Sequence, residues 1–211
     1  MSPTNEEKHQ ETYAAAEKAV RALDPEDVAR RAGAVWVSGG PGAGRIEMEV
    51  LGGRVIIEWP ELSFEAEPPL ARLFPWRLIA LHHLAMATGA QPGEDWISYR
   101  ELPDGLFYAN TITREVEEPL ARAYATNHDL FIAAGAPLGA VPAGIADASL
   151  LFHPLPRMPV VFALWVEDEE FPAKVKVLYE RAAVRGLPLQ DLRILADLIG
   201  GSLKAAAPRP E

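Results

Sequence analysis

The chain has 211 residues, of which 49% are hydrophobic, and it carries a formal net charge of −10. This length suits a single domain and is sufficient to bury a large core without covalent cross-links. The sequence contains no cysteine, which excludes disulfides, Fe–S clusters and thiolate-bound metals held by this chain. Its negative charge would repel the phosphates of nucleic acids, so we expect no nucleic-acid partner.

The two ends of the chain carry no sign of export or membrane insertion. Residues 1–11 are polar and acidic, unlike a signal peptide. The longest apolar run, residues 160–166, is too short to cross a bilayer. We therefore expect a cytoplasmic protein with no membrane partner. It would form one domain over residues 1–203, followed by a flexible, proline-rich tail at 204–211.

Two helices are predicted at the N-terminus. Apolar residues repeat at helical spacing within residues 6–23. Asp24 is a good N-cap for a short second helix, and Gly33 is placed to end it. A short strand is expected at 34–37. The glycine-rich residues 38–44 are interpreted as a flexible loop, and the absence of a GxGxxG or GK[ST] pattern argues against a nucleotide site there.

A β-hairpin is predicted at residues 45–59, where apolar and polar residues alternate on both sides of Gly52-Gly53. A two-residue turn at these glycines aligns the apolar faces of the two strands. It also places Glu47 opposite Glu58 on a solvated outer face. The three apolar pairs predicted by this register are Val50 with Val55, Met48 with Ile57, and Ile46 with Trp59.

The middle of the chain predicts mainly helices. Residues 75–88 are apolar on most sides, which is typical of a helix inside a fold. The other expected elements are a strand at 95–99, a turn at 102–105, and helices at 119–125 and 127–134.

The last third of the chain predicts a second hairpin. Residues 160–166 form a continuous apolar run typical of a covered strand, and residues 174–180 alternate. Three prolines argue against a central strand at 153–159. The remaining expectations are a strand at 148–152, a loop at 167–172, and a helix from Pro188 to about Ile199 that Gly200 stops. Local strand connections of this kind favour an α+β fold, with an antiparallel sheet built from two hairpins and packed with amphipathic helices.

No catalytic motif is present, so candidate site residues come from side-chain chemistry alone. His82 and His83 are adjacent, and helix geometry points them about 100° apart, which prevents them from chelating one ion together. We expect one to pack in the core and the other to face a groove. The proline after His153 would fix that side chain near the acidic loop.

The acidic loop itself supplies the other candidates. Asp168 and Glu169 are expected to face water, or to turn inward and bind a cation or cap a helix. Trp165 ends the preceding strand, where it would either pack in the core or line a pocket mouth. The candidate site therefore comprises His83, His153, Trp165, Asp168 and Glu169. If His83, His153 and Glu169 converged, a hydrolytic or metal site would be credible.

Several segments resemble the bacterial and archaeal family catalogued as domain of unknown function 3786. They are DPEDVARRAGA (24–34), DWISYRELPDGLFY (95–108), Asp147-Ala148, residues 152–183 and LPLQDL (187–192). The resemblance implies no assigned activity and no functional residue. It does imply an association with anaerobes and with corrinoid or one-carbon metalloenzymes, because some members carry an additional Fe–S domain.

Two functional hypotheses follow. The first is a non-catalytic accessory domain that binds a small molecule or a partner protein at the sheet edge near residues 153–171. The alternative is a metal- or tetrapyrrole-dependent enzyme, for example one using a corrinoid, with His and carboxylate ligands. The cofactor is unknown on either hypothesis.

Overall fold

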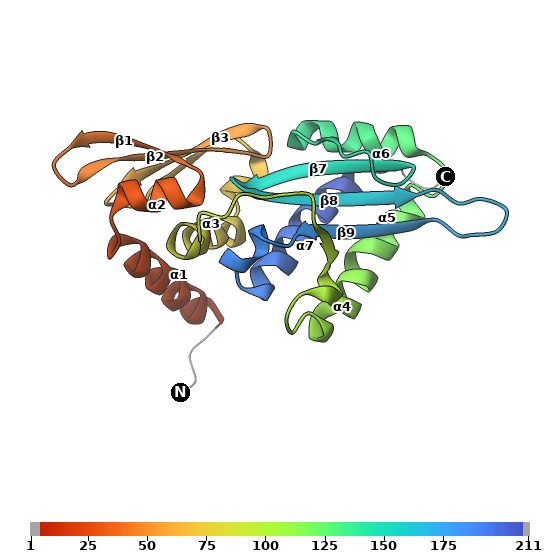
Figure 1. Cartoon of the computed structure of the whole chain (residues 1–211), viewed down its shortest axis with the longest axis horizontal. Coiled ribbons are helices and arrows are strands. Elements are labelled where there is room, and N and C mark those ends of the chain that lie inside the picture. The colour runs from red at the N-terminus through yellow and green to blue at the C-terminus, as the bar shows by residue number, and fades with distance from the viewer. Residues whose placement is uncertain (1–4, 209–211) are drawn as a thin grey trace.

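The protein contains two antiparallel sheets with helices packed beside them (Figure 1). The structure is a computed structural model that describes residues 5–208. The N-terminal sheet has the order β1 (Val35–Gly40), β2 (Ala43–Val50), β3 (Gly53–Trp59), β4 (Phe64–Ala66). The C-terminal sheet has the order β5 (Trp96–Ser98), β9 (Lys174–Glu180), β8 (Met158–Trp165), β7 (Ala148–Leu155), β6 (Val141–Pro142). The α+β class is therefore confirmed, although the two predicted hairpins lie in different sheets.

The helices account for most of the remaining chain. In Figure 1, α1 and α3 lie below the N-terminal sheet, and α7 lies below the C-terminal sheet. Their bounds are α1 Asn5–Arg21, α2 Pro25–Ala32, α3 Phe74–Met86, α4 Leu106–Ile112, α5 Glu118–Ala123, α6 His128–Gly135 and α7 Leu189–Ala206. Short 3₁₀ turns are η1 Pro69–Arg72, η2 Tyr99–Glu101, η4 Ala136–Leu138 and η5 Ala183–Gly186.

The ends of α2 are those that the sequence predicts. The Asp24 carboxylate accepts a hydrogen bond from the backbone N–H of Asp27, which satisfies one of the free donors of the first turn. Gly33 closes the helix in the left-handed conformation, with φ of 78°. Likewise, Asn127 caps α6 by accepting from the N–H of Leu130.

The first hairpin forms, but its predicted register is wrong by two residues. Val50 pairs with Gly53, because the turn residues are Leu51 and Gly52. Both have positive φ, 50° and 72°, as a type I′ turn requires. Gly53 instead makes room for Pro68, whose Cγ atom would lie 2.7 Å from a Cβ at that position. A shift of two residues keeps every side chain on its predicted face, so the apolar face stays buried.

The new register also removes the predicted Glu47–Glu58 contact. Glu47 lies opposite Ile56 and forms ion pairs with Arg45 and Arg54, at 2.6 and 2.5 Å. The prediction of a flexible loop at 38–44 is also wrong. These residues continue β1, make a tight turn and begin β2.

Residues 153–159 form the end of β7, a turn and the start of β8, so strand structure extends further into this segment than the predicted strands at 148–152 and 160–166. The β7–β8 ladder is irregular between Phe152 and Leu155, so Pro154 lies where no regular ladder bond is lost. Pro156 lies in the turn. The partner strand β6 pairs only with Leu150 and Leu151, which leaves the outer edge at His153 free of a strand.

The last helix extends past Gly200, which the sequence analysis expected to stop it. It continues to Ala206, so residues 204–206 of the predicted tail are helical, while residues 209–211 lie outside the described part. Gly200 serves a packing role instead. A Cβ atom there would lie 2.6 Å from Cγ1 of Val116, which means that only glycine allows α7 to approach so closely.

A π-helical segment, Thr113–Glu117, joins α4 to α5 and was not predicted. The N–H of Glu118 bonds to the carbonyl of Thr113, five residues back. This segment brings the buried Glu117 carboxylate to β9, where it accepts from the N–H of Val177 at 3.1 Å and from Lys176 Nζ at 2.6 Å. Glu117 thus satisfies a strand donor that the short β5 does not reach.

The two sheets meet at a contact between backbones. Gly52, in the β2–β3 turn, packs against Gly139, which precedes β6, so closely that a Cβ at Gly139 would lie 2.4 Å from Gly52. Beside this contact the N–H of Leu51 donates to the carbonyl of His153 at 2.9 Å. Buried hydrophobic residues from both sheets form one continuous cluster.

Candidate functional site

The predicted site residues lie at two opposite ends of strand β8. His83 and His153 are near the β7–β8 turn, whereas Trp165 ends β8 and is followed by Asp168 and Glu169. The eight residues of β8 correspond to a separation of roughly 25 Å. In Figure 1 the loop after β8 projects away from the body at the far right. The structure therefore does not bring His83, His153 and Glu169 together.

His83 is the core histidine of the adjacent pair. It is 4% exposed, and its Nε2 lies 3.1 Å from the carbonyl oxygen of Ala32. Burial lowers the pKa of His83 to about 4, against the opposing effect of the Ala32 and Pro156 carbonyls. The ring is therefore neutral at pH 7 and donates from Nε2. Its Nδ1 has no hydrogen-bond partner within residues 5–208.

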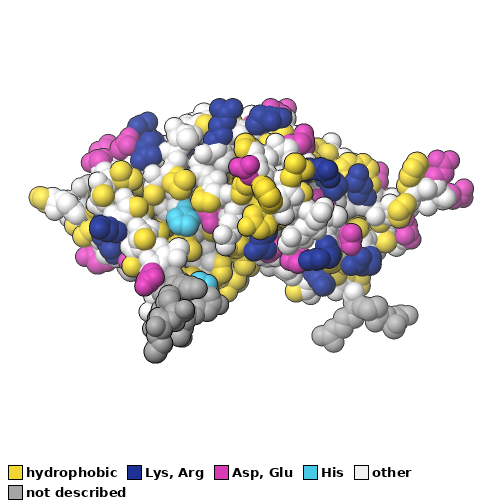
Figure 2. All heavy atoms as spheres, turned by 90° about the horizontal axis from the view of Figure 1, so that it is seen from below, with side chains coloured by type: hydrophobic (Ala, Val, Ile, Leu, Met, Phe, Trp, Pro, Cys, Tyr) yellow, Lys and Arg dark blue, Asp and Glu magenta, His cyan; other side chains and the backbone are white. Residues whose placement is uncertain are grey.

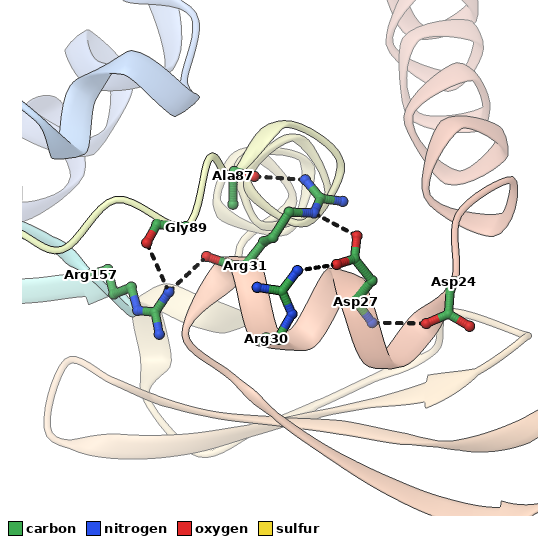
Figure 3. A network of polar contacts seen from close by, with 7 residues as sticks. All are labelled: Asp24, Asp27, Arg30, Arg31, Ala87, Gly89 and Arg157. Carbon is green, nitrogen blue, oxygen red and sulfur yellow. Dashed lines mark hydrogen bonds and ion pairs between the residues drawn. The ribbon is translucent and has the colours of Figure 1, made fainter.

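Beside this histidine lie Arg31 and Arg157, which belong to the polar network drawn in Figure 3. Arg157, in the β7–β8 turn, donates to the carbonyls of Arg31 and Gly89 at 3.2 and 3.4 Å. Arg31 donates to the carbonyl of Ala87 at 2.6 Å and to the Asp27 carboxylate at 2.9 Å. The network ties the end of α2 to the end of α3 and to the C-terminal sheet, which is a structural role.

His82 is the outward-facing member of the pair, and the sequence analysis did not select it. Its Nδ1 lies 2.6 Å from Oδ2 of Asp191, a residue of α7 whose side chain is 7% exposed. Because the carboxylate accepts from Nδ1–H, the neutral ring presents Nε2 as an acceptor. This is the orientation that a general base or a metal-binding histidine needs.

His153 and the acidic loop have mainly structural contacts. His153 is exposed, partial desolvation lowers its pKa, and its carbonyl binds Leu51. Asp168 Oδ1 accepts from the N–H groups of Glu170 and Phe171 at 2.8 and 2.7 Å, which closes the loop. Trp165 is partly exposed, with Lys174 Nζ 5.6 Å from its ring centroid.

A cavity of about 370 Å³ lies elsewhere, on the β5 side of the C-terminal sheet. It is bounded by β5 and η2, by η5, and by the first turns of α7. Its lining is mainly apolar: Ile97, Leu102, Pro103, Val184, Leu187, Leu189 and Leu192. Cavities of this size and lining are typical of small-molecule sites.

Three charged residues complete the cavity lining: Glu101, Arg181 and Arg185. Glu101 accepts from the N–H and hydroxyl of Ser98, at 2.8 and 2.7 Å, and these hydrogen bonds lower its pKa. Arg181 Nε donates to Asp95 Oδ2 at 2.7 Å. Arg185 is exposed and has no hydrogen bond or ion pair in the described structure.

The sequence analysis missed this cavity because its residues come from distant segments with no shared motif. The only signal was indirect: several lining residues fall within the segments 95–108 and 187–192 that resemble the family. Figure 2 shows one face of the molecule, with hydrophobic side chains gathered near its middle and acidic ones at the tip of the projecting loop.

No group of three His, Asp or Glu side chains among residues 5–208 is arranged to hold a metal ion. No helix in this part of the chain has both the length and the apolar composition to span a membrane.

The fold and cavity define an α+β domain with two antiparallel sheets and an apolar pocket with charged residues in its lining. Comparison with protein families then identifies its relatives: the family described as Domain of unknown function (DUF3786) matches residues 24–201. The chain belongs to this family, as the resemblance indicated. Comparison with curated proteins and with solved structures gives no significant match.

Proposed function

We propose that this protein is a non-catalytic binding domain whose ligand is a small molecule held in the 370 Å³ cavity. The cavity is the observation that carries the proposal, because its apolar lining can bury a ligand while its few charged residues orient it. This location differs from the sheet edge near residues 153–171 that the sequence analysis favoured. An accessory role in anaerobic metabolism and a cytoplasmic location belong to the same proposal, supported by the family resemblance and by composition.

Filling the cavity tests this function. Leu189 lines the cavity and is only partly buried, so Leu189→Trp should occupy the space without unfolding the protein. We expect small amphiphiles to raise the melting temperature of the wild type and to have no effect on this variant. Equal stabilisation of both proteins would show that the ligand binds elsewhere.

The loop after β8 is the second candidate surface, suited to a partner protein. Asp168 holds the loop closed through two backbone hydrogen bonds, whereas no such bond is formed by the Glu169 side chain in residues 5–208. We therefore expect Glu169→Ala to weaken partner capture with no change in loop structure. Asp168→Ala should increase amide exchange of Glu170 and Phe171. If neither change reduces capture from native extract, the loop is structural only.

The alternative function is a metal- or tetrapyrrole-dependent enzyme, and one observation favours it. The Asp191 carboxylate orients the His82 imidazole so that its Nε2 is turned outward. Histidines that bind a metal ion or the axial position of a tetrapyrrole are oriented in the same way. The test is elemental analysis and an absorption spectrum of protein purified without oxygen. Bound metal or a tetrapyrrole band that disappears in His82→Gln, but stays in the exposed control His128→Gln, would support the enzyme. A colourless, metal-free sample contradicts it.

A further inference from the structure

The charges around the cavity are unequally compensated. Glu101 is engaged by Ser98, and Arg181 by Asp95. Among the charged residues of the lining, Arg185 is the one whose side chain has neither a hydrogen bond nor an ion pair in the described structure. A guanidinium beside an apolar surface, with no ion pair of its own, favours a carboxylate, which it binds with two parallel hydrogen bonds.

The same charges restrict what else can bind. A cationic ligand would meet both Arg181 and Arg185. A ligand with several negative charges would meet the Glu101 carboxylate, which its hydrogen bonds keep ionised. The lining therefore suits a ligand with one negative charge.

The volume and the lining set the rest of the ligand. A space of 370 Å³ corresponds to about a dozen water-sized groups. The side chains that face it are mostly leucine, valine and isoleucine, which stabilise an aliphatic body by burial at about 25 cal/mol per Å².

Resting on the binding function proposed above, we propose that the cavity takes an aliphatic monocarboxylate of medium length. Its carboxylate pairs with Arg185 at the mouth, and its chain lies against Leu102, Leu187 and Leu192. Arg185 is thus the residue that determines specificity for anions.

The experiment compares three eight-carbon probes, octanoate, octanol and octylamine, by isothermal titration against the full chain at pH 7.5. We expect octanoate to bind at least tenfold more tightly than either of the others. Replacing Arg185 with alanine should weaken octanoate at least tenfold and leave octanol unchanged, since a hydrogen bond to a charged group is lost. The matched control is Arg122→Ala, an exposed arginine on α5 outside the cavity.

The outcomes separate the two proposals. If none of the three probes binds, or if Leu189→Trp leaves their binding unchanged, the cavity is not a ligand site and the proposed function fails with it. If all three bind equally, or R185A binds octanoate as the wild type does, the ligand class is wrong while the cavity remains the binding site. Tighter binding of octylamine than of octanoate would also overturn the monocarboxylate assignment.

Discussion

His83 and His82 show how neighbouring residues of one type acquire different chemistry. One ring is buried against the carbonyl of Ala32, and the other is oriented by Asp191 at a partly exposed position. The buried ring cannot gain a proton without the cost of placing a charge in the core. It therefore links the stability of the fold to pH.

This linkage predicts a specific loss of stability in acid. The folded-state pKa of His83, about 4, lies below its ordinary value of 6.5. Between these values the unfolded chain binds a proton that the folded chain excludes, so stability is complete above pH 6.5 and falls as the pH drops towards 4. At about 1.4 kcal/mol per pKa unit, the loss from this residue approaches roughly 3 kcal/mol.

Urea unfolding at several pH values measures this effect. Because carboxylates also titrate in this range, the informative quantity is the difference between the wild type and His83→Gln. We expect the variant to be less stable at pH 7 and the gap to narrow as the pH falls to 4. A gap that is constant with pH would mean that His83 is not the group responsible.

At the scale of elements, the packing of α7 against the π-helical segment depends on one glycine. Gly200 and Gly201 are neighbours in α7, but only a side chain at Gly200 would meet another atom, Cγ1 of Val116 at 2.6 Å. Val116 is buried and β-branched, so its side chain has little freedom to move. Gly201 has nothing within 4 Å.

Alanine at these two positions should change stability in opposite directions. Gly201→Ala should stabilise the protein by up to about 1 kcal/mol, because alanine favours the helix. Gly200→Ala should destabilise it by about 1–2 kcal/mol, because overpacking exceeds that gain. The free energy of unfolding in urea checks both. Stabilisation by both substitutions would show that α7 does not pack this closely.

Elements with local signals were predictable from the sequence, and those that depend on distant contacts were not. The two ends of α2 were predictable from Asp24 and Gly33, residue types that favour the N-cap and the C-terminal end of a helix. In contrast, residues 106–117 combine exposed aromatic residues with β-branched threonines and show no clear helical period. The hairpin turn lies one residue before its predicted position because the backbone N–H of Leu51 donates to the carbonyl of His153, a residue about a hundred positions away.

At the scale of the whole molecule, the two sheets are joined through a pair of glycines. Gly139 has a φ of 67°, and a Cβ there would lie 2.4 Å from the backbone of Gly52. Gly144 has a similar φ of 70° with nothing within 4 Å. The two positions therefore differ in close packing and not in backbone conformation.

We expect Gly139→Ala to reduce stability by about 2 kcal/mol more than Gly144→Ala does. Both substitutions carry the cost of a left-handed alanine, roughly 1–2 kcal/mol, and only the first also forces the sheets apart. Chemical denaturation measures both values. Equal losses would show that the contact between the sheets yields easily.

The candidate site also belongs to this scale, which is why the sequence did not predict it. Its lining comes from β5, η2, η5 and α7, and no motif joins them. Asp168 and Glu169 were predicted as site residues because adjacent acidic residues are easily recognised in a sequence. Arg185 is one charged residue among many, and only the folded chain shows that it stands beside an apolar cavity.

The π-helical segment Thr113–Glu117 restricts how the length of this chain can vary among relatives. Removing one residue there would leave a regular α-helix, and every later side chain would turn by about 100° around its axis. Leu120 would leave the core, and the Glu117 carboxylate would leave the edge of β9. Homologous chains should therefore conserve the number of residues between Leu106 and Ala123 even where the residues themselves differ.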